Sequence, residues 1–308
     1  MAPIPPSGRQ YVITQADQRA VVTEVGGGLR RYSVAEHDVL DGYAESEICS
    51  VARGAPLLPW PNRLQDGRYD FGGETLQTAI TEPSRQNAIH GLTRWLSWRG
   101  FQPAEDRVTM RLLLHPQDGY PFTLSLAIEY RLSSDGLAVR TTATNLGTRA
   151  LPYGAGHHPY LTVGTDRIDD ALLSLPAALR LEVDDRQIPT CRLLPVDQGD
   201  SDFRTARRIA DTRLDTAFTG LIRDADGMAR VGMRSPDGRR SLTLWMDGAH
   251  DYLMVFTGDT IPDQARRRRG LAVEPMTCAP NAFRNRLGLV VLEPEQSLTT
   301  SWGIFATA

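Results

Sequence analysis

The 308-residue sequence is poor in cysteine and in long apolar runs. Its three cysteines, Cys49, Cys191 and Cys278, are far apart and form no CxxC pair, which is typical of reduced thiols in a cytoplasm. The N-terminus shows no basic stretch followed by an apolar one, as a secretory signal would. No apolar run approaches the roughly 18 residues that span a bilayer. We therefore expect a cytoplasmic protein with no membrane partner.

Several catalytic motifs are also missing from the sequence. It contains no GxSxG, no P-loop, no Rossmann glycine pattern and no HExxH. The motifs that usually indicate serine hydrolysis, ATP chemistry or hydride transfer are therefore missing. The net charge of −3 and the isoelectric point near 6.1 argue against nucleic acid as a partner. From these absences we predict neither a cofactor nor a metal.

Helical periodicity is scarce, and strand periodicity is common. The clearest case surrounds residues 133–136, where apolar side chains alternate over 124–132 and again over 137–143, which predicts a hairpin with one buried face. Further strands are expected in the following ranges: 11–14, 20–25, 29–34, 68–71, 108–114, 241–245, 252–257, 287–292 and 301–305. One short helix is expected over 202–210, with Asp202 as its cap.

The pattern of short strands between turn residues predicts an all-β sandwich of large sheets. The glycines at 26–28 suit a tight hairpin turn. We expect a frayed, proline-rich start over residues 1–10. Because no linker or repeat follows it, a single domain over residues 11–308 is predicted.

The stretch Gly154-Ala155-Gly156-His157-His158-Pro159-Tyr160 holds two adjacent histidines near the middle of the chain. Glycine allows a tight turn or a close approach to a ligand. An imidazole there could give or take a proton near neutral pH. A turn with two surface histidines is the simpler interpretation of this motif alone.

Other polar side chains stand in similarly suggestive settings. Arg63 lies in a loop stiffened by proline, and its planar donors suit hydroxyl or anionic oxygens; a surface arginine is the alternative. His90 precedes a glycine among apolar residues, where a core histidine is more common than a catalyst. Asp215 lies among apolar neighbours and could equally cap a loop.

Glu274 ends an apolar stretch, and Pro275 is expected to stop the strand there. Burial would raise the pKa of this carboxyl group and make it a better base near neutral pH; an exposed glutamate at a strand end is an equal alternative. The run Arg266–Arg269 suggests an anion site or, more often, a solvated loop.

Taken in order, these stretches resemble the aldose 1-epimerase (galactose mutarotase) family. The resemblance runs from about Tyr11 to the C-terminus, and its strength lies in the order of five motifs, none of them specific alone. The matching stretches are Asn62-Arg63-Leu64 with Gly67, residues 87–91, His158-Pro159-Tyr160-Leu161, Leu214-Asp215-Thr216-Ala217-Phe218, and Glu274-Pro275 with Pro280-Asn281-Ala282. The turn Phe256-Thr257-Gly258-Asp259 is similar to a family turn as well.

The resemblance implies a β-supersandwich that binds a free monosaccharide in an open cleft. By the family pattern, Glu274 is the general base at the C1 hydroxyl, His158 the general acid at the ring oxygen, and His90 assists. The residues implied to bind sugar hydroxyls are Asn62, Arg63, Tyr160 and Asp215. Such a pair would open and reclose the hemiacetal, and each group would contribute about 10²–10⁴ in rate. Neither metal nor nucleotide is required, and a monomer or homodimer is expected.

Some residues depart from the family pattern. Leu92-Thr93-Arg94-Trp95 replaces a glycine-containing continuation, Met254 stands where many members have glutamine, and His157 where many have asparagine. The acid–base pair is intact, while the choice between galactose, glucose or a modified sugar stays open. Extra arginines would even suit a sugar that carries an anionic group.

Three other functions compete with a mutarotase. A glycoside hydrolase or lyase would use Asp215 and Glu274 as its two carboxylates. A non-catalytic sugar-binding or regulatory protein would not need both Glu274 and His158. A zinc site formed by His90, His157, His158 and Glu274 would place both adjacent histidines on one ion, but adjacent strand residues usually point to opposite faces.

Overall fold

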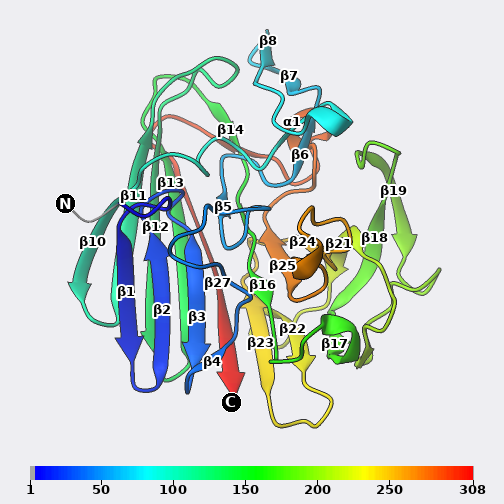
Figure 1. The fold of residues 1–308 in the computed structure, drawn as a ribbon. Helices are drawn as coiled ribbons and strands as arrows, with labels where there is room; N and C mark the ends of the chain where they lie inside the picture. Colours follow the sequence, from blue (N-terminus) through cyan, green and yellow to red (C-terminus); the bar gives the residue numbers. More distant parts are fainter. Residues whose placement is uncertain (1–3, 308) are drawn as a thin grey trace.

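The computed structural model describes residues 4–307, in which nearly all regular structure is β-strand. The strands form sheets of nine, eight and four strands and three two-stranded ribbons. Figure 1 shows the four-stranded sheet (blue) lying over strands of the nine-stranded sheet, with the eight-stranded sheet beside it. The predicted all-β sandwich is confirmed.

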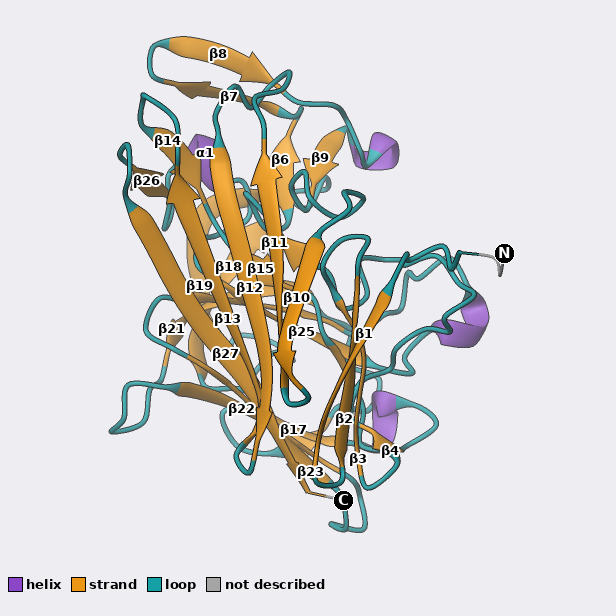
Figure 2. Cartoon of the chain, turned by 90° about the vertical axis from the view of Figure 1, so that its left-hand side faces the viewer, coloured by secondary structure: helices purple, strands orange, loops and turns teal. Residues whose placement is uncertain are grey.

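The nine-stranded sheet is the layer on which the other two sheets pack; Figure 2 shows its long strands side by side and facing the viewer. Its strands, in spatial order, are β10 (Arg99–Ala104), β11 (Arg107–Leu114), β12 (Leu124–Ser133), β13 (Gly136–Asn145), β27 (Ser297–Thr307), β23 (Ser241–Met246), β22 (Ala229–Arg234), β17 (Leu172–Ser174) and β20 (Arg207–Arg208). The predicted hairpin is β12–β13, with Ser133 paired to Gly136. Its alternate residues from Leu124 to Leu132 are buried, so one face belongs to the core.

The four-stranded sheet packs on β11 and β12. Its strands are β1 (Gln10–Gln15), β2 (Gln18–Thr23), β3 (Leu29–Val34) and β4 (His37–Asp38). The glycine turn joins β2 to β3 as predicted, and the Thr23 amide donates to the Gly28 carbonyl at 2.9 Å. The frayed start is not seen over residues 7–10: the carbonyls of Ser7 and Arg9 accept hydrogen bonds from Val25 and Glu24, which tie the chain to the β2–β3 turn. Residues 1–3 lie outside the described range.

The eight-stranded sheet faces the inner side of the nine-stranded one. Its strands are β19 (Pro189–Pro195), β18 (Ala177–Val183), β21 (Asp215–Leu221), β24 (Tyr252–Phe256), β25 (Leu271–Met276), β15 (Gly156–His157) and β5 (Pro56–Leu57), with β16 (Tyr160–Leu161) also paired to β25. The two sheets meet where the His157 ring of β15 lies 5.2 Å from the Trp302 ring of β27.

The remaining strands form ribbons at one end of the sandwich. They are β6 (Arg63–Gln65) with β9 (Asn87–Ile89), β7 (Arg68–Phe71) with β8 (Glu74–Gln77), and β14 (Leu151–Tyr153) with β26 (Val290–Leu292). Within residues 4–307, helix is confined to α1 (Ala282–Asn285) and three 3₁₀ turns, Pro83–Arg85, Ile168–Asp170 and Gln264–Arg266. No helix in residues 4–307 is long and apolar enough to cross a membrane.

Three local predictions need correction. Residues 202–210 form no helix, because the Asp202 carboxylate accepts hydrogen bonds from the Arg204 backbone and side chain while β20 pairs with β17. Strand β25 continues through Pro275 to Met276; on one side its ladder is interrupted between Ala272 and Met276, where a residue without an N–H is tolerated. Of the strand expected over 287–292, only β26 forms.

Candidate active site

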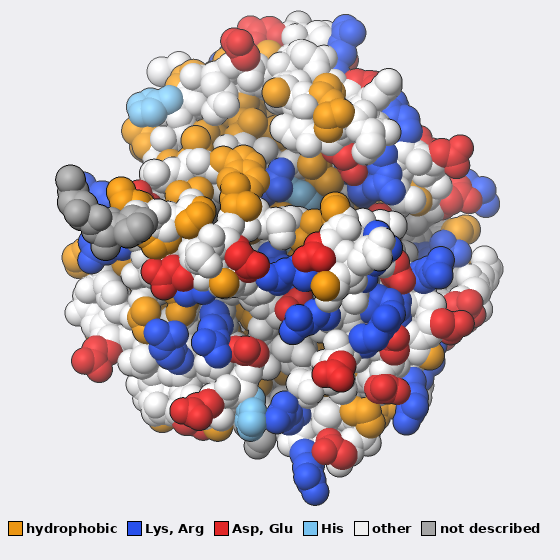
Figure 3. Space-filling view, viewed as in Figure 1, with side chains coloured by type: hydrophobic (Ala, Val, Ile, Leu, Met, Phe, Trp, Pro, Cys, Tyr) orange, Lys and Arg blue, Asp and Glu red, His pale blue; other side chains and the backbone are white. Residues whose placement is uncertain are grey.

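The residues singled out from the sequence come together in one cleft of about 730 Å³. Figure 3 shows arginine and acidic side chains around a hollow near the centre of this face, with a histidine visible inside it. Residues from five separate stretches line the cleft, namely Asn62, Arg63, His90, His158, Tyr160, Asp215 and Glu274. The fold therefore joins positions more than two hundred residues apart in the chain.

Glu274 enters the cleft from the middle of β25. Its neighbours on both sides are buried, and the Glu274 side chain is only 2% exposed. Burial, followed by the charge of Asp215, raises its pKa well above the usual value, and Arg63 opposes this shift. Glu274 is therefore a buried carboxyl group within the strand, and its interpretation as an exposed glutamate at a strand end is wrong.

His158 lies against Glu274, with Nε2 at 3.2 Å from Oε1. Burial lowers the pKa of His158 to about 3 and raises that of Glu274, so it favours the neutral form of both groups. The second heteroatom of each group, Glu274 Oε2 and His158 Nδ1, has no hydrogen-bond partner among residues 4–307. The pair thus retains unused hydrogen-bonding capacity.

His157 points to the opposite side of the strand, into the space between the two large sheets. Its Nε2 is 2.8 Å from the Thr141 hydroxyl on β13, and burial lowers its pKa to about 3. The two adjacent imidazoles therefore cannot share one ion. No group of three or more His, Cys, Asp or Glu side chains within residues 4–307 is arranged to hold a metal ion.

Tyr160 holds the His158 ring by stacking against it. The two rings are stacked, with centroids 5.0 Å apart and planes 16° apart. On the Tyr160 ring, the Arg53 guanidinium lies 4.2 Å from the centroid and forms an ion pair with Asp41. The Tyr160 hydroxyl donates a hydrogen bond to the Val51 backbone carbonyl at 3.3 Å.

Asn62 fixes His90 at the other side of the pair. The Asn62 backbone N–H donates to His90 Nδ1 at 3.3 Å, which leaves the ring proton on Nε2. Burial, and then the charge of His158, lowers the pKa of His90 well below its usual value, so this ring is a neutral donor. The His90 and His158 ring centroids are 5.2 Å apart.

Arg63 is held by a carboxylate that the sequence did not reveal. Glu82 accepts from Arg63 Nε at 2.9 Å and from Nη2 at 3.1 Å. Burial alone would raise the pKa of Glu82, but the hydrogen bonds and charge of Arg63 outweigh it and the pKa is lowered. Asp215 Oδ2 lies 3.8 Å from Arg63 and 3.9 Å from Arg85, so Asp215 faces two cations.

Other cleft residues also escaped sequence reasoning. They are chiefly Glu82, Arg85, Arg94, Asp185 and Phe256. Arg94 had a visible signal, because it falls where the sequence departs from the family pattern. Phe256 had one too, because the turn that begins with it resembles a family turn. Glu82, Arg85 and Asp185 had none: their place depends on the 3₁₀ turn Pro83–Arg85 and on loops that meet only in the folded chain.

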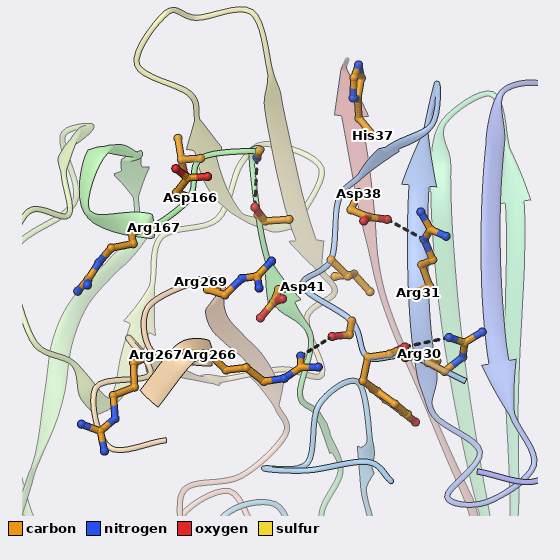
Figure 4. Close-up of a pocket in the computed structure, with 18 of the residues that line it drawn as sticks. Arg30, Arg31, His37, Asp38, Asp41, Asp166, Arg167, Arg266, Arg267 and Arg269 are labelled. Carbon is orange, nitrogen blue, oxygen red and sulfur yellow. Dashed lines mark hydrogen bonds and ion pairs between the residues drawn. The ribbon is translucent and has the colours of Figure 1, made fainter. Parts of the chain in front are cut away.

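A larger groove of about 1070 Å³ lies away from this pair, between the four-stranded sheet and the loop that follows β24 (Figure 4). Its charged side chains are largely bonded to one another: Arg31 to Asp38 and Arg266 to Glu47, each at 2.7 Å. In the run Arg266–Arg269, Arg267 donates to the Ile261 carbonyl and Arg268 forms ion pairs with Asp169 and Asp259. The arginine run therefore serves chiefly to fix its loop.

A family model described as aldose 1-epimerase matches residues 9–304 of the chain. The chain belongs to the aldose 1-epimerase family. The sequence resemblance is thereby confirmed, and family and fold together support a carbohydrate epimerase. Membership also explains why the five motifs occur in this order.

Relatives and solved structures agree with this family. The uncharacterised protein YihR of Escherichia coli K12 is 35% identical over 288 residues, which are 93% of this chain and 90% of that protein. The aldose 1-epimerase of the same organism is 28% identical over 66% of this chain and 60% of its own length. The fold is similar to a Caenorhabditis elegans homologue of aldose epimerase, with a TM-score of 0.86, 16% identity and coverage of 97% and 98%.

Proposed function

We propose that this protein is a mutarotase, which interconverts the α and β anomers of a free aldose. The observation that carries the proposal is the buried Glu274–His158 pair at 3.2 Å on the wall of a sugar-sized cleft. A carboxyl and an imidazole in contact, each with a second heteroatom unpartnered within residues 4–307, form an acid–base couple with room for a substrate's own donors and acceptors.

In this mechanism the two groups exchange one proton each with the sugar. Glu274 takes the proton of the C1 hydroxyl, and His158 gives one to the ring oxygen, which opens the hemiacetal. Rotation about the C1–C2 bond presents the other face of the aldehyde, and the reverse transfers close the ring. Only protons move between protein and substrate, so the protein returns to its starting state after each turnover.

The pKa shifts favour this cycle. After ring opening, Glu274 is protonated and His158 is neutral, and these are the forms that burial favours. The binding of the cyclic sugar must therefore draw the pair toward the carboxylate and imidazolium. Arg63 assists this change because its charge lowers the pKa of Glu274.

The other cleft residues orient the substrate. His90 donates from Nε2 near the ring oxygen, while Asn62, Arg63 and Asp215 bind hydroxyl groups. Tyr160 holds the His158 ring by stacking, and its hydroxyl remains with the Val51 carbonyl. We propose that these residues act within one domain over residues 11–308 and in the cytoplasm.

Glu274→Gln tests the assignment. The amide has the same shape as the carboxyl group but cannot accept the C1 proton, so we expect the rate of anomer exchange to fall by about 10²–10⁴ while the fold is retained. The measurement is polarimetry of freshly dissolved α-D-glucose and α-D-galactose in weakly catalysing buffer, with exchange NMR for other aldoses. Glu105→Gln, at an exposed position, is the matched control. Bound sugar without any anomer exchange would show a non-catalytic sugar-binding protein instead.

A further inference from the structure

Arg94 is a cleft arginine without a carboxylate partner. Three arginines line the cleft, Arg63, Arg85 and Arg94. The first two lie beside Glu82 and Asp215. Within residues 4–307 no acidic side chain lies within 4.0 Å of the Arg94 guanidinium, and its hydrogen bond there goes from Nη2 to the Ile89 carbonyl at 3.3 Å.

The position of Arg94 removes much of its hydration. The side chain is partly buried, and desolvation lowers the pKa of its guanidinium, which the nearby Cys49 only partly opposes. Removing a charge from water costs free energy unless a partner replaces the water. The guanidinium has five donors in a planar fork, and the Ile89 carbonyl uses only one of them. An anionic ligand in the cleft would supply the missing partner.

The loop that carries Arg94 is well fixed. The Leu92 amide donates to the Leu58 carbonyl at 2.7 Å, and the Gly26 amide donates to the Leu96 carbonyl at 2.9 Å. The ring of Trp98 is buried and its N–H donates to the Thr93 carbonyl at 3.4 Å. Because the backbone on both sides of Arg94 is bonded to other segments, the cation is presented to the cleft at little cost in loop entropy on binding.

Arg94 lies at the end of the cleft that holds the two histidines. It is bonded to Ile89, the residue before His90. Its charge contributes to the lowered pKa values of both His90 and His158 but not to the pKa of Glu274, whereas the charge of Arg63 acts on His90 and Glu274. In the proposed mechanism the histidines face the ring oxygen, O5. That atom is bonded to C5, which carries C6, so a sugar held with O5 at the histidines and its C1 hydroxyl at Glu274 would direct its C6 substituent toward the Arg94 end of the cleft.

We propose that the substrate is an aldose with an oxyanionic group on C6, and that the Arg94 guanidinium binds this group. The inference rests on the mutarotase function proposed above and specifies its substrate class. Carboxylate, phosphate and sulfonate all present oxygen acceptors that match the guanidinium fork. The neutral hydroxymethyl group of glucose or galactose would leave the charge of Arg94 without a counter-ion.

Anomer exchange at equilibrium, measured by exchange NMR, tests the substrate class. The probes are glucose, galactose, glucuronate, glucose 6-phosphate and 6-deoxyglucose-6-sulfonate. We expect kcat/KM for at least one of the three anions to exceed that for both neutral sugars by tenfold or more. The comparison among the anions then identifies which oxyanion fits.

Arg94→Gln tests the residue. A hydrogen bond between charged groups contributes about 1.5–3 kcal/mol, so we expect the anionic-to-neutral ratio of kcat/KM to fall about 10–100-fold, mainly through KM. Arg94→Lys keeps the charge without the fork and should recover part of that ratio. Arg111→Gln, at an exposed position on β11, is the matched control and should leave the ratio unchanged.

Two results would overturn the inference: faster turnover of neutral than of anionic sugars, or equal losses for both classes in Arg94→Gln. Calorimetric titration of the Glu274→Gln protein separates this inference from the proposed function. If no sugar is turned over, yet the anions bind in an Arg94-dependent way, only the mutarotase activity fails. If glucose is turned over and the anionic sugars bind no more tightly than glucose, the mutarotase function stands and only the inference of an anionic substrate fails.

Discussion

At the residue scale, the two adjacent histidines have different surroundings and should therefore have different roles. His158 contacts Glu274 in the cleft, whereas His157 contacts Thr141 and Trp302 between the sheets. We expect His158→Asn to lower the rate of anomer exchange by about 10²–10⁴, the contribution typical of a general acid. His157→Asn should lower it by less than about threefold, because no proton transfer in the proposed cycle passes through His157.

The comparison requires both variants under one assay, with thermal unfolding to show that each is folded. Each variant controls for the other, since the same substitution is made at neighbouring positions of the chain. Equal losses of activity would mean that the roles of the two imidazoles have been misassigned.

How much of the cleft could be predicted depends on whether a residue has a local signature. Glu274, His158 and His90 stand in recognisable motifs, and the structure places all three in the cleft. Glu82 precedes the 3₁₀ turn Pro83–Arg85 with nothing unusual in its sequence. It meets Arg63 because β6 pairs with β9 and the Glu82 backbone bridges to Asn87 at the start of β9. No pattern along the chain records such a contact.

At the scale of elements, the cleft depends on the close approach of two loops. His90 and Gly91 both have positive φ, at 63° and 69°, and a Cβ at Gly91 would come within 2.0 Å of the Leu58 carbonyl oxygen. Gly91→Ala should therefore destabilise the protein by about 2–5 kcal/mol, from backbone strain and overlap. Because His90 and Arg94 flank the site, kcat/KM should fall more than tenfold.

Gly72→Ala is the control for this substitution. Gly72 has a similar φ of 60°, but no heavy atom beyond its two chain neighbours lies within 4 Å of its added Cβ. It should cost only about 1–2 kcal/mol of backbone strain, with activity retained. Urea unfolding and the exchange assay measure both effects. If the two variants lose the same stability, the contact with Leu58 does not constrain the loop.

Strands could be predicted from the sequence where buried and exposed side chains alternate with a simple period. The β12–β13 hairpin was predicted because one face is buried and the other is not. The helix expected over 202–210 was wrong because a possible cap at Asp202 says nothing of tertiary pairing, and β20 finds its partner in β17. The end of β25 was misplaced because the position of Pro275 at a gap in the ladder depends on β15 and β16.

At the scale of the whole molecule, the packed sheets lower the pKa of three buried histidines. Burial lowers the pKa of His90, His157 and His158 in the folded chain, whereas an unfolded histidine titrates near 6.5. Below that pH the unfolded chain takes up protons that the folded chain does not. Stability should therefore fall as the pH is lowered, while Glu274, whose pKa is raised, acts in the opposite sense.

His157 allows this effect to be isolated. Its pKa is lowered from 6.5 to about 3, so between these values it makes folding less favourable by up to about 1.4 kcal/mol per pH unit. His157→Asn loses packing against Trp302 and should be less stable at pH 7 by about 1–3 kcal/mol. That deficit should shrink as the pH falls from 7 to 4, because the variant no longer buries a neutral imidazole. Urea unfolding across this range measures it, and parallel curves for the two proteins would contradict the argument.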